Sequence, residues 1–446
     1  MRVAVVGTGY VGLVTAACFA ELGHEVVCVD LDHARLDQIL RGVAPFHEPG
    51  LSELVRQHAG RTLLATNDIA DAVHRSQLSI LAVGTPSADG KIDLRAVRSA
   101  ARSIGASLRD SSEYHAVVVK STVVPGTTDG PIRAALEEAS GRVAGTDFGV
   151  GMNPEFLTEG QAVADFMEPD RLVLGADDPQ TRALLEELYA AFPSRVPRVF
   201  TNTRTAEMIK YTSNTLLATM ISFSNEIANI CAAVGDVDVV DVLDGVHLSR
   251  YLTPHGEDGA PVRAPISSFL EAGCGYGGSC LPKDTAALIG MAAELGEATP
   301  VLRAVVETNA GRPDEMLRLA KARVGSLDGL RATVLGLAFK PDTDDIRESP
   351  AIAIVRKLLA HGATVVVHDP IVTELPDEIR KPDVTLTNEL GDALARADVA
   401  LLVTRWDAYR DVPAILAALD NPPLLVDGRR MLDRRSVAEY VGIGCS

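Results

Sequence analysis

The sequence has few cysteines, a deficit of positive charge and no long apolar run, and each shortage excludes a class of protein. Its six cysteines, Cys18, Cys28, Cys231, Cys274, Cys280 and Cys445, lack metal-ligand spacing, so we expect no metal site and a reducing compartment. Sixty acidic residues against 42 basic ones give a net charge of −18 without any lysine- or arginine-rich block, which argues against a nucleic acid partner. No apolar run has the length of a membrane span, so we expect no membrane.

The amino terminus is apolar like a signal peptide but is interrupted by Gly7, Gly9 and Gly12 and ends without an A-x-A-like cleavage site. We interpret it as folded structure and expect a cytoplasmic protein. The 446 residues are 47% hydrophobic with a mean hydropathy of +0.13, which predicts a globular chain with several cores.

The first 198 residues alternate between strand and helix patterns. Residues 2–6 predict a strand, a glycine turn follows, a helical pattern begins after Gly12, and residues 25–29 predict a second strand that ends at Asp30. Further strand-like runs lie at 79–83, 115–119 and 171–174. This alternation predicts a parallel sheet covered by helices on both faces, with the domain ending near residue 198.

The rest of the chain predicts a helical region and a second sheet domain. Residues 206–234 contain no glycine or proline and predict one helix about 45 Å long. Residues 236–250 and 284–322 predict further helices, with an exposed loop over 251–268. From residue 331 the strand–turn–helix–strand pattern returns. We therefore expect an α/β fold: two Rossmann-like doubly wound parallel-sheet domains, 1–198 and 326–446, joined by a central helical region, 199–325, with one long helix.

The glycine turn has the context of a dinucleotide site. Gly7, Gly9 and Gly12 follow a strand and open a helix, so the turn is tight, the backbone is open to a pyrophosphate, and helix and strand pack closely. Asp30 can accept hydrogen bonds from both adenosine ribose hydroxyls, which favours NAD over NADP, although the nearby Arg35 could tolerate a 2′-phosphate. A second segment, Gly84-Thr85-Pro86, either lines the cofactor crevice or forms an ordinary turn.

Two polar pairs have both structural and functional interpretations. In residues 153–160 an Asn, a Pro and an acid have the order of a helix start, which would place Glu155 and Glu159 on one helix face. Lys210 and Asn214 are four residues apart on the long predicted helix. They form either its solvated stripe or part of a site.

Cys280 has the setting of a nucleophile. Pro282 predicts a helix start directly after it, and the positive end of that helix would depress the pKa of the thiol. Glycines 275, 277 and 278 leave room for a ligand near the sulfur, and Asp284 is one turn away. The charged segment 339–349 either solvates a loop or, with Lys340 and Arg347 at the carboxyl end of a strand, binds a ligand.

Together these motifs resemble the nucleotide-sugar 6-dehydrogenase family. The strings GTGYVG, VGTP, KSTVVPGT, NPEFLTEG, AEMIKYTSN, GYGGSCLPKD, FKPDTDDIRESP, VTRWD and VDGRR occur in the family's order over nearly the whole chain. The resemblance implies an NAD-binding domain, a central dimerisation region and a C-terminal domain that binds a sugar nucleotide. It also implies oxidation of a CH₂OH group to a carboxylate with two NAD⁺, by a homodimer or higher homo-oligomer.

The resemblance also implies residue roles. Cys280 would form a thiohemiacetal and then a thioester, since an aldehyde loses hydride only after a nucleophile adds to it. Lys210 and Asn214 would stabilise the charge that develops on oxygen. Asp284 would move protons with a water held by Thr122. Glu155 is the candidate base for hydrolysis, with Glu159 in the same site.

Two larger sets complete the expected sites. The cofactor set is Gly7, Gly9, Tyr10, Val11, Gly12, Asp30, Arg35, Gly84, Thr85, Pro86, Thr122, Glu159 and Arg347. The substrate set is Phe156, Leu157, Lys210, Asn214, Arg250, Arg263, Phe269, Tyr276, Gly277, Phe339, Lys340 and Arg429, where either Arg250 or Arg263 would reach a substrate across a dimer interface.

The sequence leaves alternative substrates and alternative classes of protein open. FKPDTDDIRESP, VTRWD and VDGRR favour UDP-glucose, whereas LSRYLTP and the leucine of GGSCLPKD lean towards GDP-mannose, and dTDP-glucose stays open. A two-electron hydroxyacid dehydrogenase or a non-catalytic NAD-binding protein would share the first domain but would not need Cys280. The yield of NADH per sugar nucleotide separates these classes: two, one or none.

Overall fold

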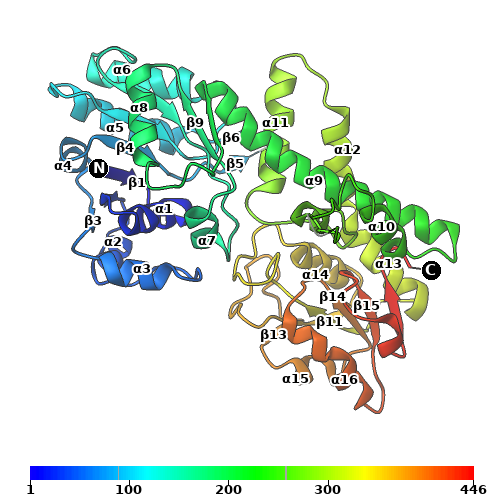
Figure 1. Cartoon of the computed structure of the whole chain (residues 1–446). Helices are drawn as coiled ribbons and strands as arrows, with labels where there is room; N and C mark the ends of the chain where they lie inside the picture. The colour runs from blue at the N-terminus through cyan, green and yellow to red at the C-terminus, as the bar shows by residue number, and fades with distance from the viewer. Residues whose placement is uncertain (89, 257–258, 446) are drawn as a thin grey trace. The chain divides into compact units, whose positions relative to one another are not determined.

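The computed structural model describes residues 1–88, 90–256 and 259–445, which divide into two compact units, Met1–Ser213 and Asn214–Ser446. Figure 1 shows the chain coloured from blue at the amino terminus to red at the carboxyl terminus. Each unit contains one large sheet, and helices dominate the chain between the two sheets. The predicted fold class, two parallel-sheet α/β domains with a helical middle, is confirmed.

The first unit is built on an eight-stranded sheet in the order β10-β9-β8-β7-β4-β1-β2-β3. Its strands are β1 (Arg2–Val6), β2 (Glu25–Val29), β3 (Leu63–Thr66), β4 (Leu78–Leu81), β7 (Ala116–Val119), β8 (Gly149–Met152), β9 (Leu172–Ala176) and β10 (Arg198–Thr201). All neighbouring strands are parallel except β8 and β9, which are antiparallel, so the sheet is mixed at one end. A short hairpin, β5 (Ser87–Ala88) and β6 (Lys91–Ile92), lies outside this sheet.

Helices cover both faces of this sheet, because Val3 to Val6 of β1 are all buried and successive side chains of a strand point to opposite faces. Val3 and Val5 belong to a core cluster with residues of α1 (Tyr10–Glu21), α3 (Leu51–His58), α7 (Ala162–Met167) and α8 (Pro179–Leu188). Ala4 and Val6 belong to a second cluster with residues of α4 (Ile69–His74), α5 (Arg95–Leu108) and α6 (Arg133–Ser140). The remaining helical segments are α2 (His33–Leu40) and the π-helical turn η1 (Thr128–Ile132).

The predicted helix start at Asn153 is wrong. Residues 153–158 have no regular secondary structure, and the next helix, α7, begins at Ala162. The side chain of Asn153 does not cap a helix because it accepts hydrogen bonds from Lys120 Nζ at 3.0 Å and Tyr189 Oη at 2.5 Å and donates one to Val173 O. Glu155 and Glu159 therefore do not share a helix face.

The long central helix is present as α9 (Thr203–Val234), three residues longer at its start than predicted. Of the described residues, this helix alone is long and apolar enough to cross a membrane by length and composition, a test that core helices also pass. The sequence interpretation expected no such run. Buried polar groups of the helix bond to other parts of the protein: Asn225 Oδ1 accepts the N–H of Gly273 at 2.7 Å, and Ser222 Oγ donates to Val305 O at 3.0 Å.

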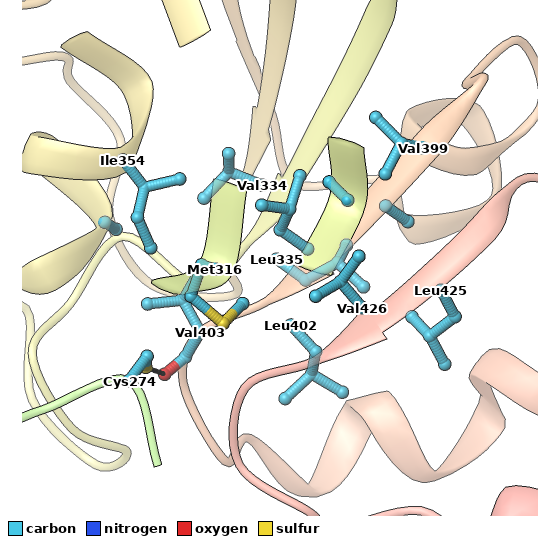
Figure 2. Packing of buried hydrophobic residues seen from close by; sticks show 14 of the residues in the cluster. Cys274, Met316, Val334, Leu335, Ile354, Val399, Leu402, Val403, Leu425 and Val426 are labelled. Carbon is cyan, nitrogen blue, oxygen red and sulfur yellow. Dashed lines mark hydrogen bonds between the residues drawn. The ribbon is translucent and has the colours of Figure 1, made fainter. Parts of the chain in front are cut away.

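The second unit contains a six-stranded parallel sheet in the order β13-β12-β11-β14-β15-β16. Its strands are β11 (Arg331–Leu335), β12 (Thr364–His368), β13 (Val384–Thr387), β14 (Val399–Leu402), β15 (Leu424–Asp427) and β16 (Tyr440–Gly442). Helices α14 (Pro350–Ala360), α15 (Leu390–Leu394) and α16 (Val412–Ala417) accompany it, with the 3₁₀ turns η3 (Asp407–Asp411) and η4 (Arg434–Ser436). Figure 2 shows the apolar core of this unit, with Cys274 close to Val403 at one side.

The helical part of the second unit is more divided than the sequence predicted. The patterns at 236–250 and 284–322 become α10 (Val239–His247), α11 (Leu281–Glu294), α12 (Pro300–Ala310) and α13 (Arg312–Val324). Proline accounts for the breaks, because Pro300 and Pro313 each occupy the first or second position of a helix. The predicted loop at 251–268 contains the 3₁₀ turn η2 (Pro265–Phe269), and its residues 257–258 lie outside the described residues.

A buried carboxyl group connects the start of α9 to the turn before η1. Glu207 is 0% exposed and accepts hydrogen bonds from the backbone N–H of Gly126 at 2.6 Å and of Thr128 at 2.8 Å. Burial raises the pKa of Glu207 from 4.5 to about 7, against the hydrogen bonds from Thr128 and Gly126, which lower it. The carboxyl group therefore titrates near neutral pH.

This raised pKa predicts that folding stability depends on pH. A neutral Glu207 contributes stability that is complete below pH 4.5 and is lost as the pH rises through 7. We expect the free energy of unfolding of the wild type to fall, relative to that of Glu207→Gln, by about 1–3 kcal/mol between about pH 5 and about pH 8. Urea unfolding of both proteins across this range measures the difference. A difference that stays constant with pH contradicts the prediction.

Candidate active site

The glycine turn after β1 has the geometry that a bound dinucleotide requires. Gly7 has φ +97° and donates its N–H to Val29 O at 2.8 Å, and a Cβ atom there would lie 2.7 Å from Ala82 O. Gly12 lies inside α1, where a Cβ atom would come within 1.9 Å of Gly7 O. Gly9 precedes α1, and nothing lies within 4 Å of its Cβ position. Gly9 thus leaves space for a phosphate at the amino end of the helix.

Asp30, at the end of β2, is held for recognition of a ribose. It accepts hydrogen bonds from Thr8 N at 2.7 Å and Thr8 Oγ1 at 2.6 Å, and from Asp32 N at 3.0 Å. Burial acts to raise the pKa of Asp30, but these hydrogen bonds outweigh it and hold the pKa below its usual value. Arg35 Nη1 lies 3.8 Å from Asp30, and Arg35 Nε lies 4.0 Å from Asp32. Two acids against one arginine disfavour a 2′-phosphate, so the site fits NAD.

Gly84-Thr85-Pro86 and Thr122 lie together at the carboxyl ends of β4 and β7. Thr85 Oγ1 donates a hydrogen bond to Thr122 O at 2.8 Å. Ser121 Oγ donates one to Val83 O at 2.7 Å. Of the two interpretations of Gly84–Pro86, this contact favours the crevice over an isolated turn, because ligands of parallel sheets bind at carboxyl ends of strands.

Sequence reasoning missed Glu48, which connects the glycine turn to the segment that carries Glu159. Glu48 is 3% exposed and accepts hydrogen bonds from Gly160 N at 2.8 Å and Ala162 N at 2.7 Å, and from the hydroxyl of Tyr10. Burial, with Glu48 adding to it, raises the pKa of Tyr10, so this hydroxyl stays a donor. The partners are 38 to 114 residues apart in sequence, and no local pattern signals them.

A buried charge cluster surrounds Glu155. Glu155 Oε1 and Lys210 Nζ are 3.0 Å apart with side chains 6% and 5% exposed, and Glu155 Oε2 accepts the N–H of Leu157 at 2.7 Å. Burial acts to raise the pKa of Glu155, but Lys210 and that hydrogen bond lower it below its usual value. The ring of Phe156 lies under two cations, with Arg171 Cζ at 3.8 Å and Lys210 Nζ at 5.5 Å from its centre. Glu155 is thus ionised at neutral pH.

Lys120, which the sequence interpretation did not select, also belongs to this cluster. It is 3% exposed and donates to Asn153 Oδ1. Burial lowers its pKa to about 8; Glu155 raises this pKa, and the like charge of Lys210 lowers it. The string KSTVVPGT could have indicated Lys120 as a site residue, because its lysine directly follows a buried strand.

The second unit groups Cys280, Asn214 and Asp284. Cys280 is the N-cap residue of α11, and its carbonyl accepts the N–H of Asp284 at 2.9 Å. Asp284 is 1% exposed and accepts hydrogen bonds from Asn214 Nδ2 at 2.6 Å and Lys283 Nζ at 2.5 Å. All six cysteines lie within the described residues; Cys280 is the exposed one, Cys445 is half-buried and the others are buried. The thiol of Cys280 therefore faces solvent at the positive end of a helix.

The remaining candidates in the second unit make contacts of several kinds. Arg429 Nη1 donates to Gly275 O at 3.0 Å, and the ring of Phe339 lies against Gly278. Arg347 forms a bidentate pair with Asp345, its Nη2 lying 2.6 Å from Oδ2. Arg263 pairs with Glu271 at 3.1 Å, whereas Arg250 is exposed. These contacts place Phe339 and Arg429 beside the glycine loop that precedes Cys280.

Comparison with known proteins agrees with this geometry over the whole chain. Three models of the UDP-glucose/GDP-mannose dehydrogenase family match: its NAD binding domain over residues 1–193, its central domain over 204–311 and its UDP binding domain over 333–434. The UDP-glucose 6-dehydrogenase AglM of Haloferax volcanii is 45% identical, covering 99% of both chains. UDP-glucose 6-dehydrogenase TuaD of Bacillus subtilis is 39% identical, covering 99% of this chain and 92% of its own. The structure is similar to that of a UDP-glucose dehydrogenase from Pyrobaculum islandicum, with a TM-score of 0.89, 37% identity, and coverage of 100% of this chain and 98% of that one.

The geometry of the glycine turn predicts that one glycine-to-alanine substitution weakens NAD⁺ binding and that another destabilises the fold. Gly9→Ala has room for its methyl group, so we expect an unchanged Tm, but the group would occupy the approach of the pyrophosphate and weaken NAD⁺ binding more than about tenfold. Gly12→Ala would place its methyl group against Gly7 O and should destabilise the fold by about 2 kcal/mol or more. Calorimetric unfolding and NAD⁺ titration measure both. A Gly12→Ala protein as stable as the wild type contradicts this account of the turn.

Proposed function

Because the chain belongs to the UDP-glucose/GDP-mannose dehydrogenase family, we propose that it oxidises the C6 hydroxymethyl group of UDP-glucose to a carboxylate in two NAD-dependent steps. The observation that carries the four-electron reaction is the exposed thiol of Cys280 at the amino end of α11. UDP-glucose is favoured because relatives at 45% and 39% identity carry that name. GDP-mannose is the second candidate, since it shares the family name.

The reaction balances with one covalent intermediate. The first oxidation converts the alcohol to an aldehyde, and the thiolate of Cys280 adds to the aldehyde carbon to give a thiohemiacetal. The second oxidation removes hydride from that carbon and leaves a thioester, which water hydrolyses to the carboxylate and the free thiol. NAD⁺ is the acceptor of the hydride in both oxidations. The sum consumes one alcohol, two NAD⁺ and one water and gives one carboxylate, two NADH and three protons.

The polar side chains of the site have separate roles in proton transfer and in the stabilisation of charge. Lys210 and Asn214 stabilise the oxygen that becomes negative during addition to the aldehyde. Glu155 forms a 3.0 Å ion pair with Lys210 and is the candidate base for thioester hydrolysis because it is ionised. Asp284, fixed by Asn214 and Lys283, acts with a water that Thr122 helps to hold.

The other predicted site residues keep their expected roles within this proposal. Asp30 and the glycine turn bind the adenosine and pyrophosphate of NAD, and Glu159 and Arg347 stay cofactor-binding residues of the proposal. Lys340 and Arg429 bind the sugar nucleotide. The three family matches support the proposed division into residues 1–198, 199–325 and 326–446. We also propose a reducing compartment, the cytoplasm, because the six cysteines of the sequence lack metal-ligand spacing.

The covalent reaction predicts both stoichiometry and mutant behaviour. With excess NAD⁺, we expect two NADH for each UDP-glucose consumed and slower or no turnover with GDP-mannose and dTDP-glucose. Cys280→Ser should lower kcat by about 10³-fold or more, because an oxygen ester hydrolyses less readily than a thioester. Absorbance of NADH and mass spectrometry of the sugar product measure both effects.

Cys274→Ser is the matched control. Cys274 is buried, its Sγ lies 3.3 Å from Val403 O, and a serine hydroxyl can donate the same hydrogen bond. This variant should keep most of the activity. Turnover by Cys280→Ser equal to that of the wild type removes the covalent mechanism, and a yield of one NADH indicates a two-electron dehydrogenase.

We also propose that the enzyme is a homo-oligomer assembled through α9. Leu216, Phe223 and Ile230 repeat every seven residues along this helix and are 51–52% exposed. Such spacing places the three side chains in one apolar stripe, which is typical of a helix that packs against another helix. A second copy of the chain offers the same stripe and fits an isologous pairing.

Interruption of this stripe should dissociate the oligomer. Phe223→Glu places a charge in the middle of the stripe, and we expect the mass measured by light scattering to fall to that of one 47.2 kDa chain. Val143→Glu, at an apolar residue of the first unit that is 55% exposed, is the control and should keep the wild-type mass. An unchanged mass for Phe223→Glu rules out this stripe as the interface.

A further inference from the structure

The loop that precedes Cys280 depends on groups outside itself for its shape. Gly275 and Gly278 have φ +95° and +80°, conformations that favour glycine. A Cβ atom on Gly277 would lie 2.2 Å from Glu348 O, so backbone packs directly on backbone there. With few side chains of its own, residues 273–278 are a glycine loop whose position is set by neighbouring side chains.

Asn309, near the end of α12, binds this loop through both ends of its amide. Its Oδ1 accepts the N–H of Tyr276 at 2.9 Å, and its Nδ2 donates to Tyr276 O at 3.1 Å. The amide therefore satisfies both backbone groups of one residue, as a neighbouring strand would. The same Oδ1 lies 2.7 Å from the Cβ position of Gly275, so only glycine fits beside it.

Arg312, three residues further along the chain, holds the other end of the loop. It is 1% exposed, its Nε donates to Gly273 O at 3.0 Å, and its Nη1 donates to Asn229 Oδ1 at 2.7 Å. Burial lowers the pKa of its guanidinium. A buried arginine aimed at a backbone carbonyl fixes that carbonyl in direction as well as in place.

The loop is also held by residues that follow β15 and by a residue shortly before α14. Arg429 Nη1 donates to Gly275 O, and the N–H of Cys274 donates to Gly428 O at 2.8 Å. Gly278 N–H donates to Arg347 O at 2.9 Å. The loop is thus fixed by both sets of contacts, and its far end leads directly into the N-cap position of α11, where Cys280 lies.

We propose that Asn309 and Arg312 are positioning residues for Cys280, which hold the glycine loop so that the thiol stays at the amino end of α11. This inference rests on the proposed nucleophilic role of Cys280. Their hydrogen bonds to the loop end on the backbone of Tyr276 and Gly273, so both act through the backbone of the loop. Loss of the amide at residue 309 frees the loop while the fold and the dinucleotide turn remain.

Asn309→Asp is the sharpest test, because it keeps shape and size, removes the donor to Tyr276 O and sets a negative oxygen against that carbonyl. A cavity of about 310 Å³ borders residue 309 and gives the variant room to hydrate. We expect kcat to fall about tenfold or more, the rate of alkylation of Cys280 by iodoacetamide at about pH 7 to fall at least about threefold, and the Kd for NAD⁺ to stay within about twofold. Peptide mass spectrometry assigns the alkylated cysteine.

Asn421→Asp is the matched control, since it makes the same exchange at an exposed residue of the same unit and should behave as the wild type. Asn309→Ser and Arg312→Lys are second variants, used if Asn309→Asp lowers the Tm strongly; each loses contacts to the loop and should show the same loss of alkylation rate. Wild-type kcat and alkylation in folded Asn309 variants overturn the positioning role. If Cys280→Ser is fully active, the proposed function fails instead, whatever the Asn309 variants show.

Discussion

Both sheets depend on one junction, where the turn after the first strand is fixed to the end of the second. In the first unit Gly7 N–H donates to Val29 O at 2.8 Å, and in the second Gly336 N–H donates to His368 O at 2.7 Å. Both glycines have φ near +100°, and each strand end is followed by an aspartate. Because ligands of parallel sheets bind at carboxyl ends of strands, this junction decides what each domain can hold.

The two aspartates show how the domains differ. Asp30 is partly exposed and retains access for a ribose, although Thr8 and Asp32 donate to it. Asp369 is fully buried and accepts five hydrogen bonds, from the backbone N–H groups of residues 337, 338, 371 and 372 and from the indole of Trp406. A carboxylate saturated by internal donors cannot bind ribose hydroxyls. The second domain therefore has the same strand–turn–helix–strand pattern as the first, but its aspartate, Asp369, stabilises the fold.

The sequence predicted the parts that local patterns determine. The glycine turn, the long helix and the N-cap position of Cys280 each depend on residues within about one or two helical turns of each other, so spacing alone was sufficient. The helix start predicted at Asn153 is absent although the local pattern is typical of one. The side chain of Asn153 is hydrogen-bonded instead to Lys120, Tyr189 and Val173. Glu48 and Glu207 were missed for the same reason: their partners are 38 to 114 and 79 to 81 residues away.

The direction of two strands explains how Lys210 reaches Glu155. A helix that follows a strand in a doubly wound sheet runs back against that strand. If β9 and β10 were parallel to β8, α9 would run from the carboxyl edge of the sheet towards its amino edge and carry Lys210 away. Instead, β9 is antiparallel to β8, and β10 follows β9. The first turns of α9 pass Gly175, beside Ala206, and continue outward to Glu155. The reversal of chain direction between β8 and β9 thus places the ammonium group of Lys210 at the edge of the sheet where the parallel strands have their carboxyl ends.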